Sequence, residues 1–203
     1  MKVFRILGID PGSRLTGYGC VDLVGNQLQH VCHGTLKIAS TSGKATVSLD
    51  DRLLLIHQGL SEVITQVRPH VMVVEKVFFA KNALSALKLG QARGAAILTG
   101  KIHGLEIAEY SPTEAKAAVS GYGQADKDQI ARMVGILLGQ KNFVTSDASD
   151  ALALAICHAY RLVSQPVAAA SQKPSLATQL SSGKKKRMSL AESLGVAAVI
   201  KKR

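Results

Sequence analysis

The stretch FRILGIDPGSRLTGYGCVDLVGNQLQHVCHGTLKI, residues 4–38, carries the pattern from which the fold follows. Phe4–Ile9 predicts a buried strand, and a Pro-Gly turn leads from it into a second strand over Thr16–Leu23. Gly25-Asn26 predicts a hairpin turn into a third strand over Gln27–Ile38. Three neighbouring strands therefore open the chain as an antiparallel meander.

Helical and strand patterns alternate after this meander. Apolar residues recur at helical spacing from Leu53 to Val67, and Pro69 is expected to end that helix. His70–Glu75 then predicts a short strand that is buried on both faces. This order indicates a mixed α/β layered domain over residues 1–163. The later elements expected are a helix over Ala83–His103, a strand over Leu105–Tyr110, and helices over Pro112–Ser120, Asp126–Leu138 and Asp147–Val163.

Charge and composition narrow the class of protein. Lys and Arg number 25 against 14 Asp and Glu, and this net charge of +11 requires a polyanionic partner or a charged tail. Hydrophobic residues make up 47% of the chain, which excludes wholesale disorder. Residues 164–203 hold eight Lys and Arg and one Glu among Ser, Ala, Gln and Pro, so we expect a basic disordered tail there. Within it, Ser189–Ile200 fits a short helix, either formed on a partner or transient without one.

The compartment is predicted from two further features. No apolar stretch reaches the roughly 18 residues of a transmembrane helix. The three cysteines are odd in number and unpatterned, which fits a reducing compartment better than a disulfide framework. We therefore expect a soluble cytoplasmic protein with no membrane partner.

Four acids occupy unusual places on this basic chain. Asp10 ends the first strand, immediately before the Pro-Gly turn, and Glu75 closes an apolar run in which a charge is costly to bury. Asp147 and Asp150 lie three residues apart in the first turn of a helix, about 4.5 Å along its axis, so both can point at one spot. Each acid alone also fits a structural role in a turn or at a helix dipole. If the first and fourth strands are neighbours, however, all four carboxylates converge.

Converging carboxylates repel one another unless a cation lies among them. Hard oxygen ligands without thiolate or imidazole favour Mg²⁺ or Mn²⁺. Two such ions, about 4 Å apart, activate a water and stabilise the leaving oxygen in phosphodiester hydrolysis. The acids therefore predict a two-metal site in which no side chain acts as the nucleophile.

Five ordered blocks resemble the RuvC family, the bacterial crossover junction endodeoxyribonucleases. The resemblance covers residues 1 to about 163 and implies a ribonuclease H-like fold, a mixed five-stranded sheet with helices on both faces. It also implies a homodimer that resolves Holliday junctions, four-way DNA junctions of recombination and repair, by paired symmetric nicks with Mg²⁺, beside the branch-migration proteins RuvA and RuvB. The blocks are GIDPGS at 8–13, EKVF at 75–78, AKNA through LKLGQARG at 80–94, GYG with ADK at 121–127, and DASDAL at 147–152.

The resemblance assigns roles to particular residues. It places two lysines near the scissile phosphate, where an ammonium holds phosphate and offsets developing charge. The sequence departs from the family at Ala115, where a branched apolar residue is usual, but the lysine that follows is in place. The residues carried over are the metal-binding Asp10, Glu75, Asp147 and Asp150 and the phosphate-proximal Lys116 and Lys127.

Adjacent aromatic side chains follow the second acid. Phe78 and Phe79 lie between Lys76 and Lys81, on a chain with only eight aromatic residues. We expect one ring to pack in the core and the other, Phe78, to stack on an unpaired base, with both flanking lysines binding DNA.

One face of the helix expected over Ala83–His103 suggests a contact with another chain. Two glycines four residues apart allow close approach of a second backbone. In the RuvC family this helix lies at the dimer interface, whereas packing on its own sheet is the alternative explanation. The residues of this face are Leu84, Leu87, Gly90, Gly94 and Leu98.

Other interpretations were compared with these. The GIDPGS segment also resembles the phosphate loop of actin-like and sugar-kinase-like ATPases, but those carry a second Asp-x-Gly hairpin and this sequence has one Asp-x-Gly. A non-catalytic DNA-binding module, with structural acids, is the third interpretation. His30, Cys32 and His33 are expected to be structural, since the sequence offers no obvious fourth ligand beside them. His158 lies about 12 Å along the helix from Asp150 and is expected to be packed or in a second layer.

Overall fold

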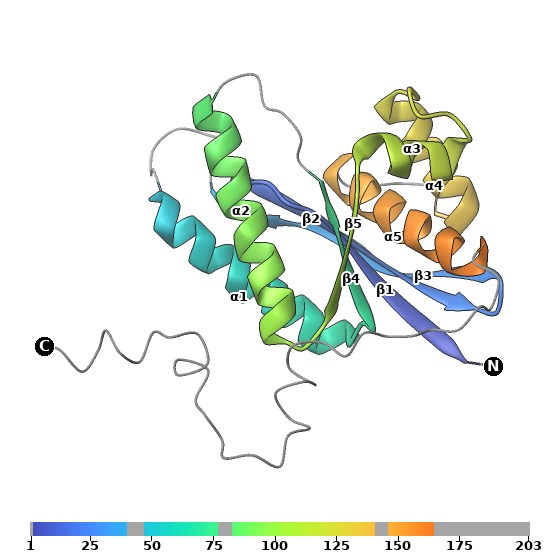
Figure 1. Cartoon of the computed structure of the whole chain (residues 1–203), viewed down its shortest axis with the longest axis horizontal. Helices are drawn as coiled ribbons and strands as arrows, with labels where there is room; N and C mark the ends of the chain where they lie inside the picture. The colour runs from blue at the N-terminus through green and yellow to red at the C-terminus, as the bar shows by residue number, and fades with distance from the viewer. Residues whose placement is uncertain (1, 40–46, 77–82, 141–145, 165–203) are drawn as a thin grey trace, which may run out of the picture. The chain divides into compact units, whose positions relative to one another are not determined.

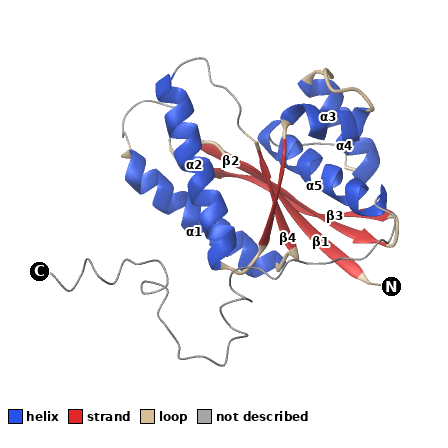
Figure 2. Cartoon of the chain, in the orientation of Figure 1, coloured by secondary structure: helices blue, strands red, loops and turns tan. Residues whose placement is uncertain are grey.

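A five-stranded mixed sheet organises the chain, with strand order β3-β2-β1-β4-β5 (Figure 1, Figure 2). The structure is a computed structural model that describes residues 2–39, 47–76, 83–140 and 146–164. The strands are β1 (Val3–Asp10), β2 (Leu15–Val24), β3 (Gln27–Lys37), β4 (Val71–Glu75) and β5 (Glu106–Tyr110), and the helices are α1 (Leu49–Val67), α2 (Ala83–Ile102), α3 (Pro112–Ser120), α4 (Lys127–Leu138) and α5 (Ser146–Ser164).

The opening meander was expected from the sequence, whereas the pairing of β1 with β4 was only a condition there. β1 pairs antiparallel with β2, and β2 pairs antiparallel with β3. On its other side β1 pairs in parallel with β4, which pairs in parallel with β5. The first and fourth strands are therefore neighbours, the condition on which convergence of the acids depended.

Helices cover the two faces of the sheet in separate layers. One core cluster joins buried sheet residues such as Leu7 and Met72 to α1 and α2, and the other joins Ile6 and Val73 to α3, α4 and α5. Figure 1 shows the same division, with α1 and α2 on one side of the strands and α3 to α5 on the other. Alternate residues of one strand thus supply both cores, as the period of two requires.

Local signals fix where the helices begin and end. Ser48 caps α1 by accepting from the Asp51 N–H, so this helix begins four residues before its apolar pattern. Arg68 ends it in the left-handed conformation, with φ of 49°, just ahead of Pro69. Asp126 caps α4 in the same way, accepting from Gln129. Elements predicted from the sequence therefore agree with the structure to within a few residues at each end.

The expectations about membrane-spanning helices and about the C-terminal tail stand as follows. No helix among the described residues is long and apolar enough to cross a membrane. The predicted tail over 164–203 lies almost wholly outside the described residues, and the proposed boundary at 163 therefore stays a prediction.

Candidate active site

Two neighbouring strand ends bring the first two acids together. Ile9 of β1 pairs with Val74 of β4, and Asp10 and Glu75 are the next residues on these parallel strands. Strand pairing alone therefore places two carboxylates at one edge of the sheet. Both side chains line a hollow of about 310 Å³ that opens at this edge.

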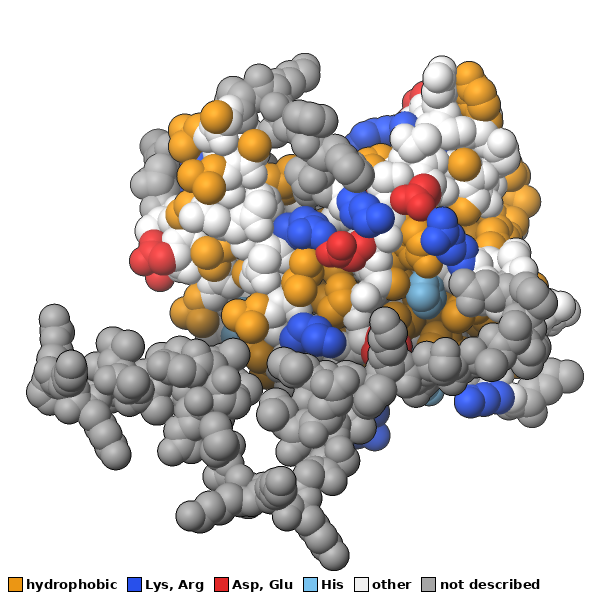
Figure 3. Space-filling model, viewed as in Figure 1, with side chains coloured by type: hydrophobic (Ala, Val, Ile, Leu, Met, Phe, Trp, Pro, Cys, Tyr) orange, Lys and Arg blue, Asp and Glu red, His pale blue; other side chains and the backbone are white. Residues whose placement is uncertain are grey.

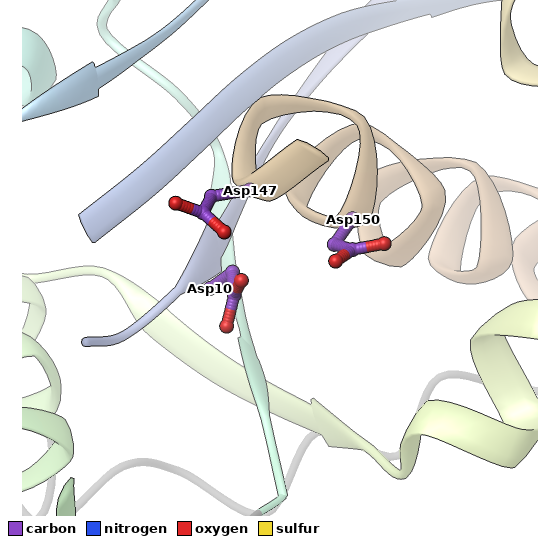
Figure 4. A group of neighbouring side chains, drawn as sticks. All are labelled: Asp10, Asp147 and Asp150. Carbon is purple, nitrogen blue, oxygen red and sulfur yellow. The ribbon is translucent and has the colours of Figure 1, made fainter. Parts of the chain in front are cut away.

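Close packing of α5 on the sheet brings the other two acids to the same edge. A Cβ atom on Gly17 would lie 2.2 Å from the carbonyl oxygen of Asp147, and one on Gly8 would lie 1.9 Å from that of Ala151. Only glycine leaves room for the helix backbone at these two positions. The first turn of α5 is thereby held over the end of β1, with Asp147 and Asp150 facing Asp10 (Figure 4).

The resulting carboxylate cluster has the dimensions of a metal site. Asp10, Asp147 and Asp150 each offer an oxygen, and these ligand atoms all lie within 4.8 Å of one another. Glu75 adjoins this group through its interaction with Asp10. The donors are all carboxylate oxygens, the ligand type that hard divalent cations prefer.

The raised pKa values of the clustered carboxyl groups indicate that the cluster needs a cation. Burial raises the pKa of Asp10 to about 8, and the neighbouring charges of Glu75, Asp150 and Asp147 add to this effect. Burial also raises the pKa of Glu75, and the charge of Asp150 adds to it. The cluster thus resists full ionisation by itself, and a divalent cation would relieve this repulsion.

Two lysines border the cluster on the α3 and α4 side. Lys127 Nζ lies 3.3 Å from Asp150 Oδ2, and the charge of Asp150 raises the pKa of Lys127. Lys116 Nζ donates to the carbonyl oxygen of Ala125 at 2.8 Å, and its side chain lines the same hollow as the acids. Both lysines predicted from the resemblance are therefore beside the carboxylates.

The remaining predicted residues fall outside the cluster or outside the described chain. Phe78 and Lys81 lie in residues 77–82, which the structure does not describe. Lys76 is described, and its N–H donates to the Tyr110 carbonyl oxygen at 2.8 Å. Its positive charge helps to lower the pKa of Glu114, after hydrogen bonds from Ser111.

The histidines that were assigned to structure have partners within the fold. Nδ1 of His158 lies 2.8 Å from the Tyr110 hydroxyl, and burial lowers the pKa of this histidine. His30 and His33 interact with each other, Nε2 to Nδ1, at 2.8 Å. Cys32 lies opposite Cys20 on the neighbouring strand, next to the core cluster that contains residues of α1. No described group of three or more metal-ligating residues includes a histidine or cysteine.

Sequence reasoning missed Arg93 as part of the site. This side chain, on α2, donates from Nε to the carbonyl oxygen of Glu75 at 3.0 Å and forms an ion pair with Glu109 on β5. The residue is part of the LKLGQARG block, but that pattern says nothing of a contact across 18 residues. Its position at the end of β4 emerged only with the packing of α2.

The sheet has the strand order 3-2-1-4-5, and two of its adjacent strands end in acids. Two more acids come from the first turn of a helix that packs on this sheet. This arrangement defines a ribonuclease H-like nuclease. The family model for crossover junction endodeoxyribonuclease RuvC matches residues 6–158. The chain belongs to the RuvC family and is thus an endonuclease of recombination and repair that resolves crossover junctions.

Relatives and solved structures agree with this assignment. Crossover junction endodeoxyribonuclease RuvC of Geobacter sulfurreducens is 51% identical over 163 residues, 80% of this chain and 96% of the relative. The RuvC of Dichelobacter nodosus is 48% identical over 162 residues, 80% of this chain and 89% of its own. Among solved structures, T. thermophilus RuvC in complex with Holliday junction substrate is 32% identical, with a TM-score of 0.70 over 78% of this chain and 94% of that one.

A more distant structure supports the fold alone. The yeast mitochondrial Holliday junction resolvase Ydc2 has a TM-score of 0.59 at 13% identity, covering 77% of this chain and 78% of that chain. The expected ribonuclease H-like fold is therefore confirmed, and the expected endonuclease activity is confirmed by the family model and the curated relatives.

Proposed function

We propose that Asp10, Glu75, Asp147 and Asp150 hold two Mg²⁺ ions and that the chain uses them to nick four-way DNA junctions. One observation carries this proposal: oxygens of three of these carboxylates lie within 4.8 Å of one another. Such spacing suits ligands shared between ions about 4 Å apart. Mn²⁺ is expected to substitute, since it accepts the same oxygen donors.

The chemistry divides between the ions and the chain. When bound, the ions lower the pKa of a water and stabilise charge on the phosphodiester oxygens. The four carboxylates hold the ions at the edge of the sheet, and the pairing of β1 with β4 keeps two of them at a fixed spacing. The shape of this edge, set by the close approach of α5 to Gly8 and Gly17, keeps the other two in place.

The two lysines balance charge on the phosphate. Lys127 lies against Asp150 and Lys116 is held by the Ala125 carbonyl oxygen, so both ammonium groups are positioned before substrate arrives. A phosphodiester in the hollow therefore meets acids that hold cations on one side and two ammonium groups on the other. Preorganised charge of this kind favours the transition state over the bound substrate.

DNA binding extends beyond the acids in this proposal. Lys76 and Lys81 contact the backbone near the junction centre, and Phe78 stacks on a base that has left its pair. The basic tail after residue 163, with its net charge of +7, adds salt-sensitive and sequence-independent attraction to DNA. RuvA and RuvB are the proposed protein partners, on the basis of family membership.

A homodimer is the proposed assembly because the substrate needs two cuts related by a two-fold axis. The structure offers an exposed apolar face for it. Leu84, Leu87 and Leu98 on α2 are each about 60% exposed, and Gly90 and Gly94 have open space where a Cβ would be. Together with Leu54 and Ile102 they present an apolar surface that the described part of the chain leaves uncovered.

A nicking assay tests the proposed reaction. Purified protein is incubated with a synthetic four-way junction and with a linear duplex, with and without Mg²⁺, beside Asp10→Asn and the control Glu106→Gln. Glu106 is exposed at the start of β5, the opposite end of the sheet from Glu75 and Tyr110. We expect symmetric nicks in the junction only, lost in Asp10→Asn and retained in Glu106→Gln, with junction binding preserved in both.

Each alternative predicts a different result. Nicking that persists in Asp10→Asn would remove this residue as a metal ligand. ATP turnover without nicking would support the kinase-like ATPase interpretation. Junction binding that is the same with and without Mg²⁺, and that leads to no nicking, would support a non-catalytic module.

A further inference from the structure

A second hollow opens on the α1 and α2 side of the sheet, beside the turn that follows Asp10. It has a volume of about 500 Å³, and its walls come from the β1–β2 turn, the first turn of α1 and the first half of α2. Three of its side chains are cationic, and no described acid is among the lining residues. We call it the basic hollow; it is lined by Ser13, Arg14, Arg52, Ser85, Lys88 and Leu89.

Hydrogen bonds fix the segments that form the basic hollow. The carbonyl oxygen of Arg14 accepts from the N–H groups of Ile38 and Ala39, at 2.9 and 3.2 Å. Arg52 donates from Nε to the Val47 carbonyl oxygen at 2.9 Å, which orients its guanidinium beside the start of α1. The backbone of one arginine and the side chain of the other are thus held in place, so a ligand would meet a partly preorganised site.

The charge and chemistry of the basic hollow suit a phosphodiester group. Arg52 and Lys88 place two positive charges on one concave surface, and an anion between them relieves their mutual repulsion. Guanidinium groups bind phosphate through paired N–H donors, an ammonium adds a compact charge, and serine hydroxyls donate to phosphate oxygens. The basic hollow offers all three types of donor.

Its distance from the carboxylates limits which phosphate it can bind. Asp10 and Arg14 are four residues apart, so their Cα atoms are separated by at most about 14 Å. One strand of B-form DNA advances about 3.4 Å per nucleotide. A phosphate in the basic hollow would therefore lie within a few nucleotides of a phosphate at the acids.

We propose that the basic hollow binds a backbone phosphate of the same DNA junction, a few nucleotides from the phosphate that is cut. This inference rests on the proposed function and adds a second contact to it. Lys116 and Lys127 border the acids on the α3 and α4 side, whereas the basic hollow borders them on the α1 and α2 side. DNA bound at both places is held on either side of the cleavage site. Figure 3 does not mark the basic hollow; it shows Lys and Arg side chains next to acidic ones in the region between these two helical layers.

The test measures binding apart from cleavage. Arg52→Gln/Lys88→Gln is compared with unmodified protein and with Lys2→Gln, a control at the opposite end of β1 from Asp10. Junction affinity is measured without Mg²⁺ over a range of salt concentrations. Single-turnover nicking with Mg²⁺ is then measured at saturating protein, and folding is checked by thermal melting.

We expect the double variant to bind the junction about ten-fold more weakly, with a salt slope that is lower by about one, because each neutralised phosphate contributes about one. Nicking at saturating protein is expected to stay within about three-fold, since no metal ligand has changed. Lys2→Gln is expected to match the unmodified protein in every measurement.

A second variant keeps the test independent of any folding defect. Ser85→Glu places a carboxylate in the basic hollow at an exposed helix position, and we expect it to weaken binding as well. If both variants bind with unchanged affinity and salt slope while the unmodified protein nicks the junction, the basic hollow is not a phosphate site. Absence of nicking by the unmodified protein would instead contradict the proposed function.

Discussion

Arg93 holds the carbonyl oxygen of Glu75 through its Nε, at 3.0 Å, from a helix on one face of the sheet. The same guanidinium pairs with Glu109 on the neighbouring strand β5. Glu75 is the last residue of β4, so this hydrogen bond fixes the backbone from which its carboxylate projects. Arg93 is therefore a positioning residue for the proposed metal site.

Replacing this arginine is expected to weaken metal use more than DNA binding. Arg93→Lys keeps the charge but loses Nε, so the Glu75 carbonyl loses its donor. We expect the Mg²⁺ concentration for half-maximal nicking to rise by about 10- to 100-fold, the usual effect of removing support behind a metal ligand. Junction binding without metal should change little.

Glu109→Gln is the matched control for this prediction. It removes the partner charge but leaves the bond from Arg93 to the Glu75 carbonyl, so its effect on the Mg²⁺ requirement should be much smaller. Equal effects of the two variants would show that the ion pair, and not the bond to Glu75, is what matters.

Metal-free protein is expected to lose stability as the pH rises. The pKa of Asp10 is raised to about 8 in the folded protein from an ordinary value of 3.8, chiefly by burial. The folded state therefore binds more protons than the unfolded state between these values, and its free energy of unfolding falls as pH increases through that window. A loss of even about 1 kcal/mol lowers the melting temperature of a chain of this size by about 2–4 °C.

Thermal melting from pH 5 to pH 8.5 in a chelator checks this expectation. Asp10→Asn should flatten the pH dependence, since it removes the group that titrates. Saturating Mg²⁺ should also reduce it, because a bound cation stabilises the ionised carboxylates. A melting temperature that rises with pH in the metal-free protein would contradict the assigned direction.

Gly17 is expected to be essential for placing Asp147. A Cβ at this position would come within 2.2 Å of the Asp147 carbonyl oxygen, so Gly17→Ala must push the first turn of α5 away from the sheet. We expect a loss of about 1–3 kcal/mol of stability and a larger loss of nicking, since one metal ligand moves. Gly90→Ala, where a Cβ meets open space, should keep or raise stability, and urea unfolding with a nicking assay separates the two.

The exposed face of α2 is expected to mediate dimer formation. Leu98 is 61% exposed in the described chain, and Leu98→Glu would place a charge in the proposed interface. We expect this variant to sediment as a monomer at concentrations where the unmodified protein is a dimer. Ile136→Glu on α4 is the control, because Ile136 is 73% exposed and lies away from this face. A monomeric unmodified protein, or a dimeric Leu98→Glu, would contradict the proposal.

Local patterns in the sequence were enough to predict the strands, the helices and the four acids. Alternation of side chains and turn residues identified the meander, and Pro69 placed the end of the first helix within a few residues. Asp10 and Glu75 stood out because a charge at the end of an apolar strand is costly without a partner. These signals depend on a residue and its near neighbours, which is why they can be recognised in a single sequence.

Only the tertiary structure decided which of these residues meet and how. The placement of β1 beside β4 is a pairing across more than 60 residues, and the approach of α5 depends on Gly8 and Gly17, whose role appears only when a helix packs on them. The bond from Arg93 to Glu75 and the three-segment basic hollow likewise join parts of the chain with no local relationship. Such contacts are selected by the burial of both sheet faces together, a property of the whole packed domain. The sequence by itself therefore determined the chemistry of the groups, and packing determined their geometry.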